Sequence, residues 1–227
     1  MWSVDDEFFL SVVNEFLTAN VLDLGCGTGR LTIALAAAGH RVVGVDPAIA
    51  SLRVARAKPG AENVDFIHGT SADLPDMPFD VAVMTSHVAQ FFLTDQQWRT
   101  TLADVHRALV PGGVLVFDAR DPEARGWERW NPTESFRQVR LPGGQIVDVW
   151  TEVTDIAEEI ISFRRHYVFA ERPELFSTAS LRFRSEHEIR LSLESCGFVI
   201  DHIFGGWRRQ KIGEGDGEFI VVAHRGQ

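Results

Sequence analysis

Three alternating glycines and one acidic residue have the types and spacing to hold a ligand that contains a ribose. Asp23 stands just before the run of Gly25, Gly27 and Gly29. Alternating glycines leave bare backbone against which a ligand can lie, where the amides of a following helix begin. Asp46 lies 21 positions beyond Gly25. That distance suits a strand–helix–strand unit that returns an acid beside the two ribose hydroxyls.

The segments around these residues are expected to position them. Val21 to Leu24 forms a short apolar run typical of a buried parallel strand, and residues 31–38 continue as an apolar helix that ends at Gly39. Residues 41–46 then predict a second buried strand. Two simpler interpretations stay open: an ordinary tight turn for the glycines, and an N-cap before Ala48 for Asp46.

The string Asp23-Leu24-Gly25-Cys26-Gly27-Thr28-Gly29 resembles the first motif of the class I S-adenosylmethionine-dependent methyltransferases. Its G-x-G-x-G spacing differs from the G-x-G-x-x-G fingerprint that places a pyrophosphate on a helix N-terminus. The resemblance implies S-adenosylmethionine as the cofactor, with Asp23 contacting its methionine part and residues 25–29 forming the loop. It also implies that Asp46 and the adjacent Pro47 lie at the ribose.

The adenine contact departs from the family pattern. A third strand over Val64 to Ile67 leads into a segment where the family usually carries an acid, and Thr70 takes that place here. The Thr70 hydroxyl and the Ser71 backbone are the first candidates to bind the adenine, with Asp73 the second. For Asp73, a solvated loop acid is an equally good interpretation.

A fourth strand, Phe79 to Met84, is followed by Ser86 and His87 at an edge where open α/β sheets hold ligands. Ser86 is a candidate cofactor contact. His87 is a candidate general base, because the ordinary pKa of histidine lies near neutrality. The alternative is a packing or hydrogen-bonding histidine under the cofactor. The segment lacks the signatures of the family's base, pyrimidine C5 and arginine methyltransferases, which points to a small-molecule acceptor.

Composition narrows the class of protein. The chain has 227 residues, 45% of them hydrophobic, enough for one substantial core. Its net charge of -10 opposes a general attraction to nucleic acid or to an anionic membrane. Cys26 and Cys196 have no neighbouring thiols, so we expect no metal site and a reducing, cytoplasmic setting. No apolar run reaches the roughly 20 residues of a membrane span.

The remaining segments complete a Rossmann-like α/β fold. A helical stripe is expected over residues 8–17, capping boxes start helices at Thr94 and Ser185, and a fifth strand covers residues 114–117. Two final strands cover residues 198–204 and 218–223. The prediction is a doubly wound, seven-stranded, mostly parallel sheet. The resemblance implies that its sixth strand is parallel to the first five and its seventh antiparallel.

Residues 121–182 are predicted to form an antiparallel insertion after strand five, with residues 1–120 and 183–227 as the cofactor-binding core. Hairpins are expected at residues 141–144 and 155–158. The aromatic residues and arginines of the insertion suit an acceptor-selecting cap, in which His166 is a second candidate base. A dimer interface or a plain sheet extension is the alternative, so the protein is expected to be a monomer or a homodimer.

These observations predict transfer of a methyl group from S-adenosylmethionine to an O, N or possibly C nucleophile of a small molecule. The sulfonium is already activated, so the protein needs mainly to align donor and acceptor and to exclude water. Two alternatives belong to other classes: a non-catalytic S-adenosylmethionine-binding module and a nicotinamide-dependent oxidoreductase.

Overall fold

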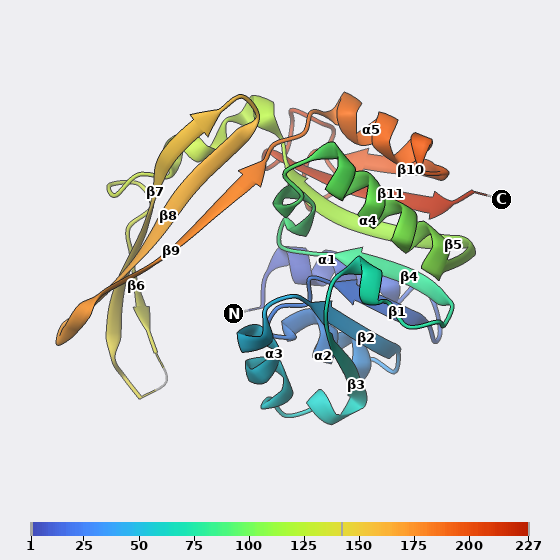
Figure 1. Ribbon diagram of the computed structural model, residues 1–227, viewed down its shortest axis with the longest axis horizontal. Helices are drawn as coiled ribbons and strands as arrows, with labels where there is room; N and C mark the ends of the chain where they lie inside the picture. Colours follow the sequence, from blue (N-terminus) through green and yellow to red (C-terminus); the bar gives the residue numbers. More distant parts are fainter. Residues whose placement is uncertain (1, 142, 227) are drawn as a thin grey trace.

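The computed structural model describes residues 2–141 and 143–226, which form two β-sheets and flanking helices (Figure 1). The strands of the larger sheet are β1 (Asn20–Leu24), β2 (Arg41–Asp46), β3 (Val64–His68), β4 (Phe79–Met84), β5 (Leu109–Arg120), β10 (Phe198–Phe204) and β11 (Glu218–Arg225). Those of the smaller sheet are β6 (Arg137–Arg140), β7 (Ile146–Ala157), β8 (Ile160–Phe169) and β9 (Arg172–Arg182).

Helices connect the strands of the larger sheet. The α-helices are α1 (Val4–Val13), α2 (Arg30–Ala37), α3 (Ile49–Arg56), α4 (Asp95–Ala108) and α5 (Glu186–Ser195). Short 3₁₀ helices are η1 (Ala61–Asn63), η2 (Ser71–Asp73), η3 (Val88–Phe91), η4 (Pro122–Ala124) and η5 (Gly126–Arg129). No helix in the described part of the chain combines the length and the apolar character of a membrane span.

The larger sheet confirms the predicted fold class. Its order within the described residues is β10-β11-β5-β4-β1-β2-β3. The strands from β1 to β5 pair in parallel, whereas β11 runs antiparallel to both β5 and β10. The direction of winding therefore reverses between β1 and β4, and the carboxyl ends of these two strands form the switch point at which such sheets hold ligands.

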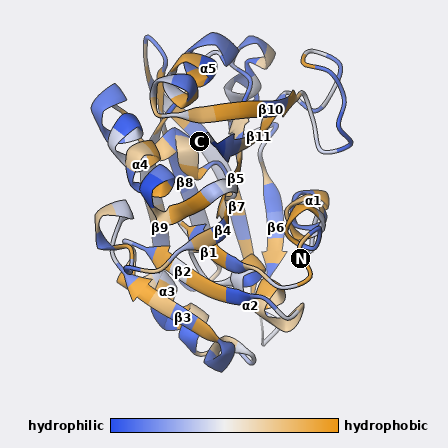
Figure 2. Ribbon diagram, turned by 90° about the vertical axis from the view of Figure 1, so that its right-hand side faces the viewer, coloured by the Kyte–Doolittle hydropathy of each residue, from blue (hydrophilic) through white to orange (hydrophobic). Residues whose placement is uncertain are grey.

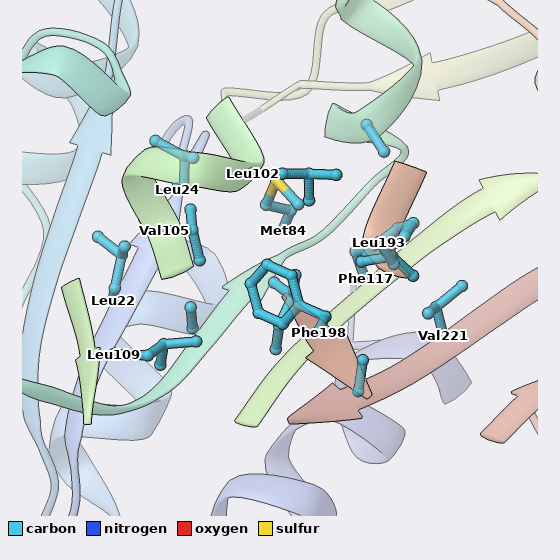
Figure 3. Packing of buried hydrophobic residues seen from close by; sticks show 14 of the residues in the cluster. Leu22, Leu24, Met84, Leu102, Val105, Leu109, Phe117, Leu193, Phe198 and Val221 are labelled. Carbon is cyan, nitrogen blue, oxygen red and sulfur yellow. The ribbon is translucent and has the colours of Figure 1, made fainter. Parts of the chain in front are cut away.

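Strand alternation sends apolar side chains to both faces of this sheet. Leu22 belongs to a cluster that includes residues of α4 and α5, while its neighbour Val21 belongs to a cluster with residues of α1 and α2. Leu102, Phe117 and Leu193 are among the buried side chains of the first cluster (Figure 3). Figure 2 shows hydrophobic residues along the central strands and hydrophilic ones on outward turns of α4 and α5. The sheet is thus buried on both faces, as a parallel sheet requires.

The first helix differs from the prediction of residues 8–17. It spans Val4–Val13 because Ser3 and Asp6 form a capping box that starts it earlier. Leu17, expected on the apolar stripe, lies beyond the helix and is 99% exposed. The acids of the first turn favour this earlier start, since negative charge stabilises a helix N-terminus.

The fifth strand is also longer than the predicted residues 114–117. It runs from Leu109 to Arg120, and its pairing with β4 shifts register between Phe79 and Val81. Gly112 adopts a φ of 77° within the irregularity, a left-handed conformation that glycine takes without strain. The extension at the other end places Asp118 and Arg120 at the ligand-binding edge, beside β11.

Strands β6 to β9, which we call the arm, form an antiparallel meander within residues 121–182. Figure 1 shows the arm leaving the upper left of the core and descending along its left side. Its base holds a small cluster in which Trp127 and Trp130 pack against Phe183, with ring centroids 4.6 and 6.2 Å away. Of the predicted hairpin at residues 141–144, Pro142 lies outside the described residues.

Candidate active site

The glycine loop between β1 and α2 lies close to the segment that follows β4. A side chain on Gly25 would place its Cβ 2.4 Å from a methyl group of Val88, so no larger residue fits there. Gly27 has a φ of 53°, and a Cβ on this residue would meet no atom within 4 Å. The loop therefore packs tightly on one side and presents open space on the other.

Asp46 ties this loop to the start of α3. One oxygen of its carboxylate accepts the Gly27 amide at 2.8 Å, and the other accepts the Ala48 amide at 2.7 Å. Ala48 precedes α3 as its N-cap residue, so the carboxylate supports the helix start as well as the loop. Each carboxylate oxygen can accept more than one hydrogen bond. Asp46 thus retains acceptor capacity for hydroxyl groups of a ligand.

Asp23 is a buried carboxylate with one unpartnered oxygen. One oxygen accepts the Thr32 hydroxyl at 2.6 Å, while the other has no hydrogen-bond partner among the described residues. Burial raises the pKa of Asp23 to about 6, against the lowering effect of the Thr32 bond, and the charge of Asp46 adds to the rise. An unpartnered buried carboxylate is costly unless a cation or donor meets it.

The other two predicted loop residues are placed differently. Cys26 is buried, and burial together with the nearby acids raises the pKa of its thiol, which stays protonated. Thr28 is exposed, and its carbonyl and hydroxyl oxygens accept bonds from the Lys58 ammonium at 2.7 and 3.3 Å. The side chain of Thr28 is therefore occupied by a partner at the end of α3.

A cavity of about 430 Å³ opens along the carboxyl ends of the strands. Its walls include six of the predicted cofactor residues: Gly25, Asp46, Pro47, Thr70, Ser71 and Ser86. They also include the apolar residue Val88, and two apolar residues that sequence reasoning missed, Phe91 and Phe92. The position of Phe91 and Phe92 depends on tertiary contacts. A second hollow, of about 460 Å³, lies at the opposite edge of the sheet around Leu109 and carries none of the motif residues.

The predicted adenine segment forms a closed local network. The Asp73 carboxylate accepts the Thr70 amide at 2.8 Å, as the acid of a capping box. The Ser71 hydroxyl donates to Asp104 of α4 at 2.7 Å, which turns it away from the cavity and leaves its backbone at the wall. Thr70 and Ser71 border the cavity, whereas Asp73 does not. This arrangement favours the first pair over Asp73 as the adenine contact.

His87 lies at the end of β4 in a cluster of acids. Ser86 and His87 both have positive φ, 56° and 64°, a strained conformation for residues with side chains. The His87 amide donates to Asp118 at 3.0 Å, and its Nε2 lies 2.9 Å from a Glu218 oxygen and 3.3 Å from Asp118. The three donor atoms lie within 4.8 Å of one another. Sequence reasoning singled out His87 but neither acid.

Asp118 resembles Asp23 in its environment. It is 1% exposed, and one of its oxygens has no partner among the described residues. Burial raises its pKa to about 6, while His87 counteracts the rise. A signal for Asp118 was available, since it follows a buried strand at the edge where ligands lie.

Gln90 links the cavity wall to the arm. Its side-chain oxygen accepts a bond from the Arg120 guanidinium at 2.9 Å, and its nitrogen donates to the Arg182 carbonyl at 3.3 Å. Gln90 is 1% exposed and belongs to η3, next to Phe91 of the cavity wall. The last residue of β5 and the last residue of β9 therefore both hold the segment that borders the cavity.

His166, the second candidate base, lies in the arm among acids of its own sheet. Its Nε2 is 3.0 Å from Glu152, its Nδ1 contacts Glu174, and its ring stacks on Trp150 at 4.8 Å. Burial lowers the pKa of His166, but the two glutamates outweigh that effect and raise it. Both ring nitrogens are engaged within the arm, whereas His87 is held by β5 and β11.

Comparison with known proteins decides the family. Residues 21–113 match the model of a methyltransferase domain. The cypemycin N-terminal methyltransferase of Streptomyces sp is 31% identical over 213 residues, which cover 90% of this chain and 82% of that protein. This chain belongs to the S-adenosylmethionine-dependent methyltransferases. The family assignment supports methyl transfer over the nicotinamide-dependent and non-catalytic alternatives.

Solved methyltransferase structures share the fold along nearly the whole chain. An S-adenosylmethionine-dependent methyltransferase from Clostridium acetobutylicum has a TM-score of 0.79 at 16% identity, covering 99% of this chain and 92% of that one. CalS10, an amino pentose methyltransferase from Micromonospora echinaspora, has a TM-score of 0.74 at 23% identity, with coverage of 99% and 92%. At these identities the likeness concerns the fold of the methyltransferase.

Proposed function

We propose that this methyltransferase transfers its methyl group to an amine nitrogen of a small molecule. The observation that carries the proposal is the position of His87, held between Asp118 and Glu218 and flanked in sequence by two cavity-lining residues, Ser86 and Val88. The name of the cypemycin relative describes an N-terminal methyltransferase, and that of CalS10 an amino pentose methyltransferase. Both names support a nitrogen acceptor.

The cofactor half of the site fits S-adenosylmethionine. The unpartnered oxygen of Asp23 suits the ammonium of the methionine part, and Asp46 has acceptor capacity for the ribose hydroxyls. Pro47, Ser86, Thr70 and the Ser71 backbone line the remaining wall, where apolar side chains can enclose the adenine. The bound cofactor supplies a methyl group already activated on a sulfonium, so the protein has to align it with the acceptor and exclude water.

The acids around His87 suit an acceptor that arrives protonated. An aliphatic amine carries a proton at neutral pH and must lose it before its lone pair can attack. Asp118 and Glu218 can hold the ammonium, and an unprotonated nitrogen of the His87 ring can take its proton. An alcohol is neutral, so it would bring no positive charge to balance the carboxylates of Asp118, which is buried, and Glu218, which is half-buried.

The arm and its base are proposed to cap the acceptor site. Residues 121–182 leave the core directly after Arg120 and return through Arg182, and both of these residues contact Gln90 of η3. Figure 1 shows the arm on the same side of the core as α3, whose start borders the cavity. Trp127 and Trp130, two aromatic residues of the insertion, pack in the small cluster around Phe183 at its base.

A deletion tests the cap. In the deletion variant, a glycine–serine linker replaces residues 121–182. The variant also carries Phe183→Ser, because Trp127 no longer covers the Phe183 side chain. It should still bind S-adenosylhomocysteine but should not transfer a methyl group. The control is the Phe183→Ser chain with its insertion intact. If a folded, monomeric deletion variant methylates at the control rate, the insertion does not select the acceptor.

The test of the acceptor uses matched pairs of small molecules that differ only in carrying an amine or a hydroxyl. We expect label from S-adenosylmethionine to enter the amines, with the methylated nitrogen identified by mass spectrometry. His87→Gln should lower kcat about 100-fold or more while leaving the affinity for S-adenosylhomocysteine unchanged. His224→Gln is the control, because His224 pairs with Asp201 on the exposed face of β11 and β10. Labelled hydroxyls with unlabelled amines, or full activity in His87→Gln, would overturn the proposal.

A further inference from the structure

We propose that Arg120 and Arg165 form a subsite for an anionic group, a carboxylate or a phosphate, carried by the same acceptor. The inference rests on the proposed function in one respect, that the acceptor lies beside His87. It concerns the part of the acceptor that lies away from its amine, which none of the cofactor-binding residues would contact. The two arginines come from different sheets, Arg120 from the core and Arg165 from the arm.

Arg120 is fixed at the end of β5. It lies directly opposite Glu218 of β11 in the antiparallel pairing, two residues beyond Asp118 on the same face of the strand. Its Nη1 donates to Gln90 at 2.9 Å, and its Cζ lies 5.2 Å from the centroid of the Trp130 ring. One edge of the guanidinium is thus committed to Gln90, and one face rests on Trp130.

Arg165 lies on the strand face of the arm that packs on the same tryptophan. On β8 it shares a strand face with Phe163, two residues earlier, and the Phe163 ring packs on Trp130 with centroids 5.0 Å apart. Its Nε donates to the Thr151 hydroxyl of β7 at 3.4 Å. This bond leaves the terminal nitrogens of the Arg165 fork for another partner.

Neither guanidinium forms an ion pair with an acid of the described residues. Among the described residues, neither has a carboxylate oxygen within the 4.0 Å of an ion pair, whereas Arg164 pairs with Glu152 at 3.9 Å and Arg125 with Glu128 at 2.7 Å. Burial lowers the pKa of Arg120, Glu218 and Asp118 oppose that effect, and Arg165 adds to the lowering. The positive charge of Arg165 therefore acts on Arg120, where the charges of Glu218 and Asp118 oppose it.

An anion bound between the two forks would interact favourably with both positive charges. Planar guanidiniums bind carboxylate and phosphate with paired, charge-assisted hydrogen bonds, which a lysine cannot reproduce. The proposed site then has two parts. Asp118 and Glu218, next to His87, would bind an amine, and Arg120 and Arg165 would bind an anion. The acceptor class is a small molecule that carries both groups.

Calorimetry tests the subsite without turnover. Inorganic phosphate, and acetate in a parallel series, are titrated into the full chain saturated with S-adenosylhomocysteine. Arg165→Gln should weaken binding of the preferred anion about tenfold or more, the loss expected for one charge-assisted hydrogen bond. Arg165→Lys should recover only part of it. The ratio of phosphate to acetate affinity in the parental protein distinguishes the two anions.

Arg164→Gln is the matched control, because Arg164 is the preceding residue on β8, points to the other face and is paired with Glu152. It should leave anion affinity within about twofold. Equal losses in the two variants would reduce the effect to general positive charge and overturn the subsite, as would undetectable binding of both anions. These outcomes are independent of the proposed function, since His87→Gln should not change anion affinity.

Discussion

The two halves of the site are built over very different distances along the chain. In the cofactor half, Asp46 bonds to amides only 2 and 19 positions away. In the acceptor half, His87 meets Glu218 across 131 positions. The matched family model, residues 21–113, covers the first half and ends before Asp118. The cofactor half therefore lies within the matched family pattern, while the proposed acceptor half joins His87 of that pattern to Asp118 and Glu218 beyond it.

Both halves nevertheless contain a buried carboxylate that lowers the stability of the fold. Asp23 and Asp118 are each almost fully buried, each has one unpartnered oxygen, and burial raises the pKa of each to about 6. Folding alone gains nothing from a buried carboxylate of this kind. We propose that each acid meets a ligand group, one on the cofactor and one on the acceptor.

The largest effect is expected from Gly27→Val, which should lower affinity for S-adenosylhomocysteine at least about 100-fold. The new side chain would enter the open side of the loop and strain a left-handed residue. Gly39→Val is the control, since Gly39 also has positive φ and open space around its Cβ position but lies after the end of α2, away from the loop between β1 and α2. Equal calorimetric losses in both variants would assign the effect to backbone strain.

Asp46→Ala should weaken S-adenosylhomocysteine binding by about 10- to 100-fold, because charge-assisted bonds to ribose hydroxyls contribute about 1.5 to 3 kcal/mol each. The loss of its bonds to Gly27 and Ala48 would loosen the loop as well. Asp65→Ala, an exposed acid on the adjacent strand β3, is the control. An unchanged dissociation constant in a folded Asp46→Ala protein would remove Asp46 from the ribose site.

The two buried acids should separate the halves. Asp23→Asn should weaken S-adenosylhomocysteine binding about tenfold. Asp118→Asn should leave that affinity unchanged and lower kcat about tenfold, since the amide still accepts the His87 amide bond but no longer holds an ammonium. Measuring the affinity for S-adenosylhomocysteine and kcat for both variants tests whether the two halves are separate. Variants that lose affinity and rate together would show that the halves are not separate.

The same variants should be more stable without ligand than the parent. The pKa of each acid is higher in the folded protein than its ordinary value, so ionisation of the acid destabilises the fold. The stability that depends on the protonated acid is intact below about pH 4 and is lost as the pH rises through 6. Each Asn variant should therefore gain about 1 to 3 kcal/mol of unfolding free energy at about pH 8 and nothing below about pH 4. Urea unfolding at the two pH values measures this difference, and an unchanged free energy at the higher pH would contradict the raised pKa.

The smallest effect is expected from removing metal ions. Dialysis against a chelator should leave the rate of methyl transfer unchanged, because the acceptor's ammonium is proposed to fill the place between His87, Asp118 and Glu218. The donor atoms of these residues are close enough to share one divalent cation. Activity that disappears on chelation and returns with a divalent metal would replace the ammonium with a metal ion in the acceptor half.

Local patterns in the sequence determined the cofactor half. Strand β4 begins and ends where predicted, and the capping boxes at Thr94 and Ser185 start α4 and α5. Asp46, at the expected distance from the loop, reaches the cavity. These features could be predicted because each depends on residues that are close in the chain or joined by one strand–helix–strand unit. Even so, the start of α1 was misplaced, since the capping box at Ser3 was not recognised.

Only the tertiary structure decided the acceptor half. No spacing rule connects His87 with Glu218, since β11 reaches His87 by pairing antiparallel with β5. Phe91 joins the cavity wall because η3, held through Gln90 by Arg120 and the Arg182 carbonyl, lies over the loop. The contact of Arg120 with Trp130, and the packing of Trp130 on Phe163 of the arm, likewise require two sheets to be placed together. Each of these contacts depends on register and packing between distant segments, which a local pattern does not encode.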